Sequence, residues 1–331
     1  MRKFINDPDD FVDEVIEAIL AAHPESLRAT GDDSRALVRA DAPGDRVGIV
    51  TGGGSGHLPL FLGYVGTGLC SGVAIGNVFS SPSAEQILAA TQAVDSGRGV
   101  LYLFGNYGGD VLNFALAGDL AELEGISTET VVGNDDVLSA GPDRADTRRG
   151  VAGLVLAYKC AGAAAERGDS LAEVAKAAGT AIAATRTVGV GLSPTILPAA
   201  GVPTFTLPDG EMEIGIGIHG EPGSHRGPLE SADQVADRLL SAILTDQPLA
   251  AGDNVVLLVN GLGATPLEEL YLLFRRVKAT LDGLGVHIHR SWIGEYATSL
   301  EMAGASVTVM KLDDQLQELF DAPAASPFFS S

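Results

Sequence analysis

The chain has 331 residues, of which 46% are hydrophobic, and it carries a formal net charge of −22 at pH 7. Its length accommodates two domains, each with a sizeable core. An acidic surface disfavours nucleic acid and anionic membranes, which bind basic patches, so we expect neither as a partner and favour a neutral small molecule as the ligand.

An amphipathic helix is expected from about residue 8 to residue 22, because apolar side chains recur there at helical spacing. Acidic residues follow Arg2 and Lys3 where a leader needs an apolar run, so neither a signal peptide nor a membrane span is predicted. The two cysteines, Cys70 and Cys160, have neither zinc nor C-x-x-C spacing and are interpreted as reduced thiols. These features together predict a cytoplasmic protein.

Residues 47–57 read Val-Gly-Ile-Val-Thr-Gly-Gly-Gly-Ser-Gly-His, and we expect the rest of the chain to be arranged around them. The apolar run predicts a buried strand, and the glycines after it predict a turn whose N–H groups face a polar ligand. His57 ends this turn and can exchange a proton near neutral pH. The segment matches neither a Walker A loop nor a dinucleotide fingerprint. A plain strand-to-loop turn with a surface histidine is the alternative interpretation.

Strands and helices alternate over the following residues, which favours a parallel sheet. The expected elements are strands at 99–104 and 130–132, and helices at about 84–96, 110–120, 150–165 and 171–184. Capping boxes begin at Ser83 and Ser170. Because ligands bind at the carboxyl ends of parallel strands, His57 and Asp110 are expected to face one crevice. Asp110 has an alternative role as the N-cap of its helix.

The pattern changes after residue 185, where strands and helices follow one another in a different order. The expected elements are strands at 188–192, 214–218, 255–259, 286–292 and 306–312, and helices at 231–244 and 266–281. The chain is therefore predicted to be α/β, with a parallel-sheet α/β domain at 1–185 and an α+β domain at 186–331. The tail from Ala322 onward either stays loose or packs back on the first domain.

The expected strand over 214–218 alternates isoleucine with glycine and ends at His219. Glycines inside a strand indicate close approach of backbone or ligand, which favours a ligand-binding role for His219 over simple strand termination. His287 and His289 lie two apart without a third ligand nearby, so no metal site is predicted. Residues 265–268 predict a capping box with proline at the first helical position.

Six segments together resemble the K subunit of dihydroxyacetone kinase. They are Arg39–Pro43, Gly52–His57, Asn106–Asp110, Gly168–Leu171, Gly215–Gly223 and Asn260–Leu267. The resemblance covers nearly the whole chain. It implies a phosphotransferase subunit that binds a short ketose, accepts phosphate on an alcohol and forms a homodimer. It also implies a separate L subunit that carries ATP or ADP with magnesium, and no cofactor bound by this chain itself.

The resemblance also implies roles for single residues. In this family the histidine at position 219 adds to the substrate carbonyl as a hemiaminal, His57 transfers protons beside the substrate hydroxyl, and Asp110 hydrogen-bonds the substrate as a candidate base. The further substrate contacts it implies are backbone groups of Gly54, Ser55 and Gly56. The chemistry agrees, because addition to a ketone needs a neutral imidazole and phosphoryl transfer needs a base near the attacking hydroxyl.

Three places depart from the dihydroxyacetone enzymes, one of them Ile75–Asn77, which replaces a Pro-Gly-Glu stretch. Gly105 stands where several members have a lysine, and Leu58 stands where glutamate often follows the histidine. Glycine in place of lysine could widen the pocket, so phosphorylation of a four-carbon ketose such as erythrulose is an alternative. A ketose-binding sensor without turnover and an acyl- or lipid-binding protein are further alternatives. The phosphoryl donor is either ATP or a phosphotransferase relay.

Overall fold

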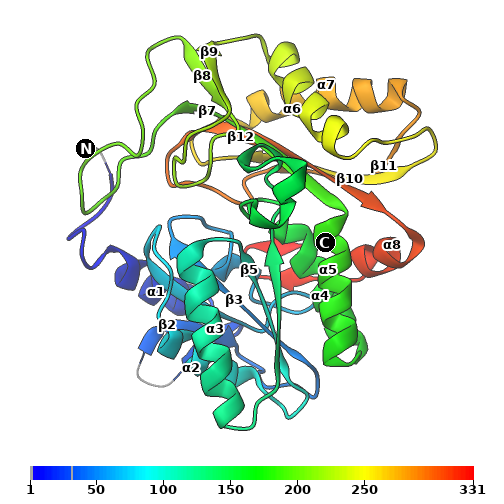
Figure 1. Cartoon of the computed structure of the whole chain (residues 1–331). Helices are drawn as coiled ribbons and strands as arrows, with labels where there is room; N and C mark the ends of the chain where they lie inside the picture. The colour runs from blue at the N-terminus through cyan, green and yellow to red at the C-terminus, as the bar shows by residue number, and fades with distance from the viewer. Residues whose placement is uncertain (1–2, 31–32) are drawn as a thin grey trace.

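The computed structural model describes residues 3–30 and 33–331, which form two six-stranded sheets with helices around them (Figure 1). The first sheet has the order β1 (Leu27–Thr30), β2 (Asp33–Arg39), β4 (Gly72–Val78), β3 (Gly48–Ser55), β5 (Val100–Gly105) and β6 (Thr128–Gly133). Strands β4, β3, β5 and β6 run parallel, and β1 and β2 form an antiparallel edge. The parallel sheet predicted for the first half is therefore confirmed.

Helices cover both faces of the first sheet. Those involved are α1 (Phe11–Ala22), α2 (Ala84–Val94), α3 (Gly108–Leu123), α4 (Leu154–Arg167), α5 (Leu171–Ala183) and α8 (Asp314–Asp321). Helices α2 and α3 pack on one face, while α1 and α4 bury apolar side chains against the other. The capping boxes predicted at Ser83 and Ser170 are confirmed.

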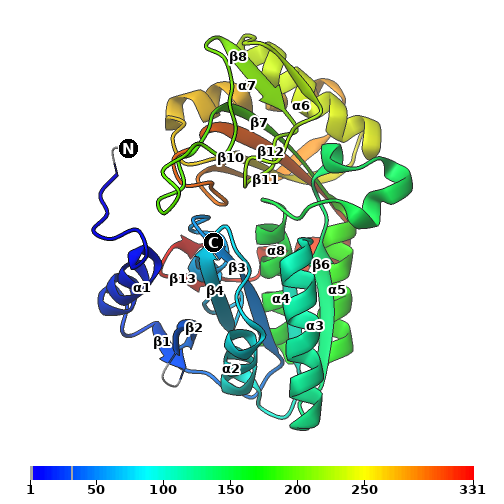
Figure 2. The same ribbon diagram turned by 60° about the vertical axis from the view of Figure 1, so that its left-hand side comes forward.

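The second sheet mixes parallel and antiparallel pairs. Its order is β11 (His287–Gly294), β10 (Asn254–Gly261), β12 (Ala303–Leu312), β7 (Thr185–Ser193), β8 (Glu211–Ile214) and β9 (His225–Pro228). Helices α6 (Ala232–Asp246) and α7 (Leu267–Gly283) cover the face away from the first sheet (Figure 2). The other face shares one apolar core with the first half, since Val256 and Met310 join the cluster that contains Val12.

The tail lies against the segment between β3 and β4. Its short strands are β13 (Ala325–Ser326) and β14 (Phe329–Ser330). The Ala325 N–H donates to the Thr67 carbonyl at 2.9 Å, and the Phe329 side chain is buried. Within the described ranges, no helix is long and apolar enough to cross a bilayer.

The glycine-rich segment is strand, where a turn was predicted. Strand β3 continues through the glycines to Ser55 and pairs in parallel with β4. A side chain at Gly53 would overlap the ring of Phe61, so the glycine is needed for close packing rather than for a turn. The chain turns only at Gly56, where φ is +100°.

The predicted strand over 214–218 is wrong beyond Ile214, where β8 ends. Gly215 has a φ of +81°, which leads the chain away from the sheet. Ile216 and Ile218 are still buried, because irregular backbone can also turn alternate side chains inward. His219 consequently lies in a turn and not at a strand end.

Two predicted helix starts are wrong. The N-cap of α3 is Tyr107, which makes Asp110 the third residue of the helix rather than its cap. The N-cap of α7 is Pro266, and no side chain caps that helix. The Thr265 hydroxyl instead donates to the Gly304 carbonyl at 2.6 Å, so a contact with the neighbouring strand replaces the capping box.

Candidate functional site

His57 follows β3 and is almost completely buried, with 1% of its surface exposed. Its Nδ1 lies 2.7 Å from the Thr298 carbonyl oxygen. Because that oxygen only accepts, Nδ1 carries the hydrogen and Nε2 keeps a free lone pair. Among the described residues Nε2 has no hydrogen-bond partner. Burial, and then the neighbouring His219, lowers the pKa of His57 to about 3, so the ring is neutral at pH 7.

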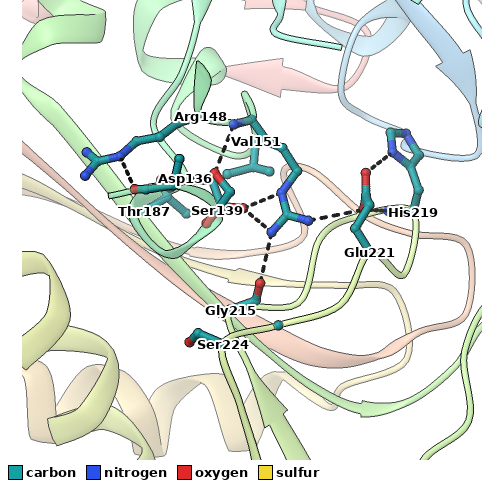
Figure 3. A network of polar contacts seen from close by, with 12 residues as sticks. Asp136, Ser139, Arg148, Val151, Thr187, Gly215, His219, Glu221 and Ser224 are labelled. Carbon is teal, nitrogen blue, oxygen red and sulfur yellow. Dashed lines mark hydrogen bonds and ion pairs between the residues drawn. The ribbon is translucent and has the colours of Figure 1, made fainter. Parts of the chain in front are cut away.

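His219 meets His57 edge to face, with ring centroids 4.8 Å apart. The Nδ1 atom of His219 is 2.8 Å from Glu221 Oε1, to which it donates (Figure 3). The rings of Phe79 and Tyr107 pack against His219, with centroids 5.2 Å and 4.7 Å away. Both histidines therefore have Nδ1 occupied, which leaves Nε2 as the atom available to a ligand.

Asp110 lies in the first turn of α3 with 8% of its surface exposed. Burial raises the pKa of its carboxyl to about 6, against the opposing effects of a hydrogen bond with Ser81 and the charge of His219. Its Oδ1 atom is buried and has no partner within the described part of the chain. The structure thus brings His57, His219 and Asp110 together, and it gives Asp110 a pKa suited to proton exchange near neutrality.

The backbone of Ser55 and Gly56 is partly committed to the fold. The Ser55 carbonyl accepts from the Phe79 N–H at 3.0 Å, and the Gly56 carbonyl accepts from the Leu300 N–H at 2.8 Å. The carbonyl oxygens of Ser55 and Gly56 are therefore each already used once within the fold.

Two of the departures from the family pattern, Gly105 and Leu58, lie in different surroundings. A Cβ atom at Gly105 would lie 3.1 Å from the ring of Tyr107, so Tyr107 occupies the space that a longer side chain would need. Leu58 lines a small cavity with Val15 and Ile16 of α1. The Tyr107 ring, which packs on His219, thus lies beside the position where other members have the lysine.

Several site residues were not found from the sequence. Tyr107 is buried, with a hydroxyl that lacks a partner among the described residues, and Glu221 holds His219. Both stand inside motifs quoted above. The phenol of Tyr107 and the carboxylate of Glu221 were the features of the sequence that could have indicated a role in the site. Thr298 is 241 residues away from His57 and acts through its backbone carbonyl, which no motif marks.

A larger cavity, of about 900 Å³, lies between α6 and residues 137–148, and neither His57 nor His219 lines it. We place the functional site at the histidines, because unpartnered buried polar atoms gather there. Within residues 3–30 and 33–331, no group of three or more histidine, cysteine or carboxylate side chains is arranged to hold a metal ion.

Comparison with known proteins identifies relatives over the whole chain. A family model described as the Dak1 domain matches residues 17–328. The chain is 43% identical over 330 residues to the dihydroxyacetone-binding subunit DhaK of PTS-dependent dihydroxyacetone kinase 2 from Listeria innocua, covering 99% of each chain. It is 42% identical over 333 residues to an L-erythrulose kinase of Pectobacterium atrosepticum, covering 99% of this chain and 56% of that protein.

Solved structures share the fold. The native dihydroxyacetone kinase of C. freundii matches 98% of this chain at 31% identity and a TM-score of 0.88, with 59% of that chain covered. A dihydroxyacetone kinase operon co-activator matches with the same identity and TM-score and is covered to 98%. The same fold therefore serves a kinase and a co-activator, so function has to be argued from the site.

Proposed function

Because this chain belongs to the Dak1 domain family, we propose that it is the ketose-binding subunit of a dihydroxyacetone-type kinase. His219 holds the substrate as a hemiaminal, and a separate L subunit supplies the nucleotide and magnesium for transfer to a terminal hydroxyl. The subunit acts as a homodimer in the cytoplasm and is a phosphotransferase with an alcohol acceptor. Its relatives are named as dihydroxyacetone and erythrulose kinases.

The observation that carries the proposal is a cluster of buried polar atoms without partners. Of the five such side-chain atoms among the described residues, three belong to His57, Tyr107 and Asp110. Leaving a buried donor or acceptor unpaired costs about 1–3 kcal/mol, so a cluster of them indicates a site that is completed by a polar ligand. A short ketose offers a carbonyl and hydroxyls to such a site.

The geometry supports a separate role for each of His219, Asp110 and His57. Neutral His219 offers the Nε2 lone pair to the carbonyl carbon, and the resulting bond fixes the substrate with its hydroxyl oriented for attack. Asp110, with a pKa of about 6, is the better base for that hydroxyl, since catalytic bases work best near the operating pH. His57, with a pKa of about 3, is neutral, and its Nε2 accepts a hydrogen bond from the substrate hydroxyl. It thereby assists the transfer of the hydroxyl proton to Asp110. Backbone N–H groups at Gly54–Gly56 complete the contacts.

A four-carbon ketose is the second candidate substrate, supported by the likeness to an erythrulose kinase. Comparing turnover of dihydroxyacetone and both erythrulose enantiomers with a matching L subunit distinguishes the two. A clear preference for the three-carbon sugar would exclude erythrulose as the main substrate.

The adduct is tested by NMR of protein labelled with ¹⁵N-histidine and mixed with [2-¹³C]dihydroxyacetone. A one-bond ¹³C–¹⁵N coupling in the wild type, lost in His219→Ala of unchanged fold, is expected. A coupling that persists in the variant would refute the assignment. Transfer of phosphate with a partner L subunit then separates the kinase from the alternative of a ketose sensor, which would bind the sugar without turnover.

A further inference from the structure

Glu221 lies beside His219 in a part of the site to which the proposed function assigns no role. We propose that Glu221, held by Arg149, is the positioning residue that keeps His219 in the tautomer and orientation needed to bond the ketose. The inference deepens the proposed function and rests on adduct formation at His219.

Both carboxylate oxygens of Glu221 hold the residue two positions before it. Oε1 accepts from His219 Nδ1 at 2.8 Å, and Oε2 accepts from the His219 backbone N–H at 3.0 Å. One carboxylate thereby fixes both the main chain and the ring of His219 (Figure 3). With Nδ1–H donated to a carboxylate, the lone pair resides on Nε2, which is the tautomer that addition to a carbonyl requires.

Arg149 anchors the carboxylate from the opposite side. Its Nη1 lies 3.8 Å from Glu221 Oε2, its Nη2 donates to the Gly215 carbonyl at 3.0 Å, and its Nε donates to Asp136 Oδ2 at 2.9 Å. Figure 3 shows this connection from His219 through Glu221 to Asp136 and Gly215. Arg149 thus ties the turn that carries His219 to the chain after β6.

Gly217 gives independent support for a built arrangement. A Cβ atom at Gly217 would overlap the Glu221 carboxylate and lie 2.6 Å from Arg149 Nη1. Only glycine allows these two side chains to approach each other above the backbone. The sequence of the turn is therefore matched to the contact between the carboxylate and the guanidinium.

The two charges act on His219 in opposite directions. A carboxylate at Nδ1 stabilises the cationic ring and so favours protonation of Nε2, which would remove the nucleophile. The positive Arg149 opposes this effect and also keeps Glu221 ionised. Although burial works against it, the hydrogen bond and charge of His219, followed by Arg149, lower the pKa of Glu221 to about 2.

Glu221, with Arg149 beside it, also takes part in the formation of the bond between His219 and the ketose. As Nε2 bonds to the carbonyl carbon, the electron pair of the C=O bond moves to oxygen and the ring becomes cationic. The ring then releases the Nδ1 proton through Glu221 to solvent, while the new alkoxide oxygen takes up a proton from solvent. One proton leaves and one arrives, so the adduct forms without any co-reactant. The carboxylate stabilises the charge that develops on the ring.

Other titratable groups also face His219 and contribute to the pH dependence of adduct formation. They are His57 and Tyr107 in ring contact, Asp110 through its charge, and Asp136 behind Arg149. Burial raises the pKa of Asp136 to about 7, so it titrates in the same range as the site. Variants must therefore be compared over a full pH series rather than at one pH.

The test measures the rate of adduct formation with dihydroxyacetone against pH in Glu221→Gln and Arg149→Met. In Glu221→Gln we expect a plateau rate roughly ten- to a hundred-fold lower, the range found when the carboxylate partner of a metal-bound histidine is removed. Its acid limb should move to lower pH. In Arg149→Met the acid limb should move to higher pH, and Arg149→Lys should restore most of the wild-type profile. Simple loosening of the turn would not produce opposite shifts.

Ring ¹⁵N spectra of the unliganded protein give a readout that needs no ketose. The wild type should show His219 with hydrogen on Nδ1, whereas in Glu221→Gln the amide can present either its oxygen or its NH₂ group and the tautomers should mix. Glu213→Gln is the matched control, because Glu213 supports the same turn through the Gly223 N–H at 2.7 Å without a hydrogen bond to His219. Its profile and spectrum should match the wild type.

Each outcome decides one question. Unchanged profiles and spectra in Glu221→Gln, or shifts of the same sign in both variants, would overturn the role of Glu221. Absence of any adduct in the wild type would instead refute the proposed function, while the ring spectra would still test the hold of Glu221 on His219. Should Arg149→Met not fold, Glu221→Gln and Arg149→Lys carry the test.

Discussion

The burial of neutral His57 should make the stability of the protein depend on pH. The pH is lowered from about 7.5 to about 5 for the wild type and for His57→Asn. Asparagine does not titrate, and its amide can still donate a hydrogen bond to the Thr298 carbonyl as Nδ1 of the histidine does. The difference between the two proteins then isolates the titration of His57.

The sign follows from proton binding. Histidine in the unfolded chain titrates near 6.5, whereas burial, and then the charge of His219, lowers the pKa of folded His57 to about 3. Below pH 6.5 the unfolded state binds more protons, so the contribution of His57 to stability is complete above that pH and is lost as the pH falls towards 3. About 2 kcal/mol should be lost by pH 5, which lies roughly 1.5 units below the unfolded value.

Urea unfolding at a series of pH values measures this loss. The free energy of unfolding of the wild type should decrease relative to His57→Asn by about 2 kcal/mol over the interval. The raised pKa values of Asp110 and Asp136 act in the opposite direction, but they cancel when the two proteins are compared. Parallel curves would show that folded His57 titrates as it does in the unfolded chain, and the neutral buried ring would have to be abandoned.

Three substitutions test other parts of the structure. Asp110→Asn should keep the ketose adduct but slow phosphoryl transfer by about 10²-fold or more in a coupled assay, and unchanged turnover would exclude Asp110 as the base. Asn260→Leu should lower the unfolding free energy by about 3 kcal/mol, since it leaves backbone groups of residues 296–297 unpaired; a loss below about 1 kcal/mol would contradict this. Gly53→Ala should cost about 1–3 kcal/mol by crowding an aromatic ring, whereas Gly179→Ala, where the space is open, should not destabilise the protein; equal melting temperatures would refute the packing argument.

Much of the architecture could be predicted from hydrophobic periodicity and capping. The parallel strands β3, β5 and β6 follow from short apolar runs, and the boxes at Ser83 and Ser170 mark real helix starts. Because β3 and β5 are parallel neighbours, the side chains just past their carboxyl ends were expected to meet. The structure places both His57 and Asp110 against His219, and their roles in the reaction stay proposals.

Glycine accounts for three of the errors. The same residue permits a turn and permits close packing along a strand, so a run of glycines does not distinguish the two. In β3 the run is strand, and at Gly215 a single glycine ends the strand that was expected to continue. The strand β4, with glycine at both its first and fifth positions, was missed for the same reason. Neighbouring apolar residues keep the same periodicity whether the glycine lies in a turn or in a strand, so this periodicity does not distinguish the two.

The two histidines show why some site contacts are visible in a sequence and others are not. Thr298 fixes His57 through a main-chain carbonyl, which every residue possesses, so its identity carries no information about the contact. Glu221 fixes His219 through a side chain two positions away, where only a carboxylate supplies the charge. Substitution at Thr298 should therefore affect His57 only by moving the backbone, whereas even the near-isosteric Glu221→Gln should change the behaviour of His219. Comparing ring ¹⁵N spectra of Thr298→Ser and Glu221→Gln tests this difference directly, and an equal disturbance of both rings would show that the distinction between backbone and side-chain positioning does not hold here.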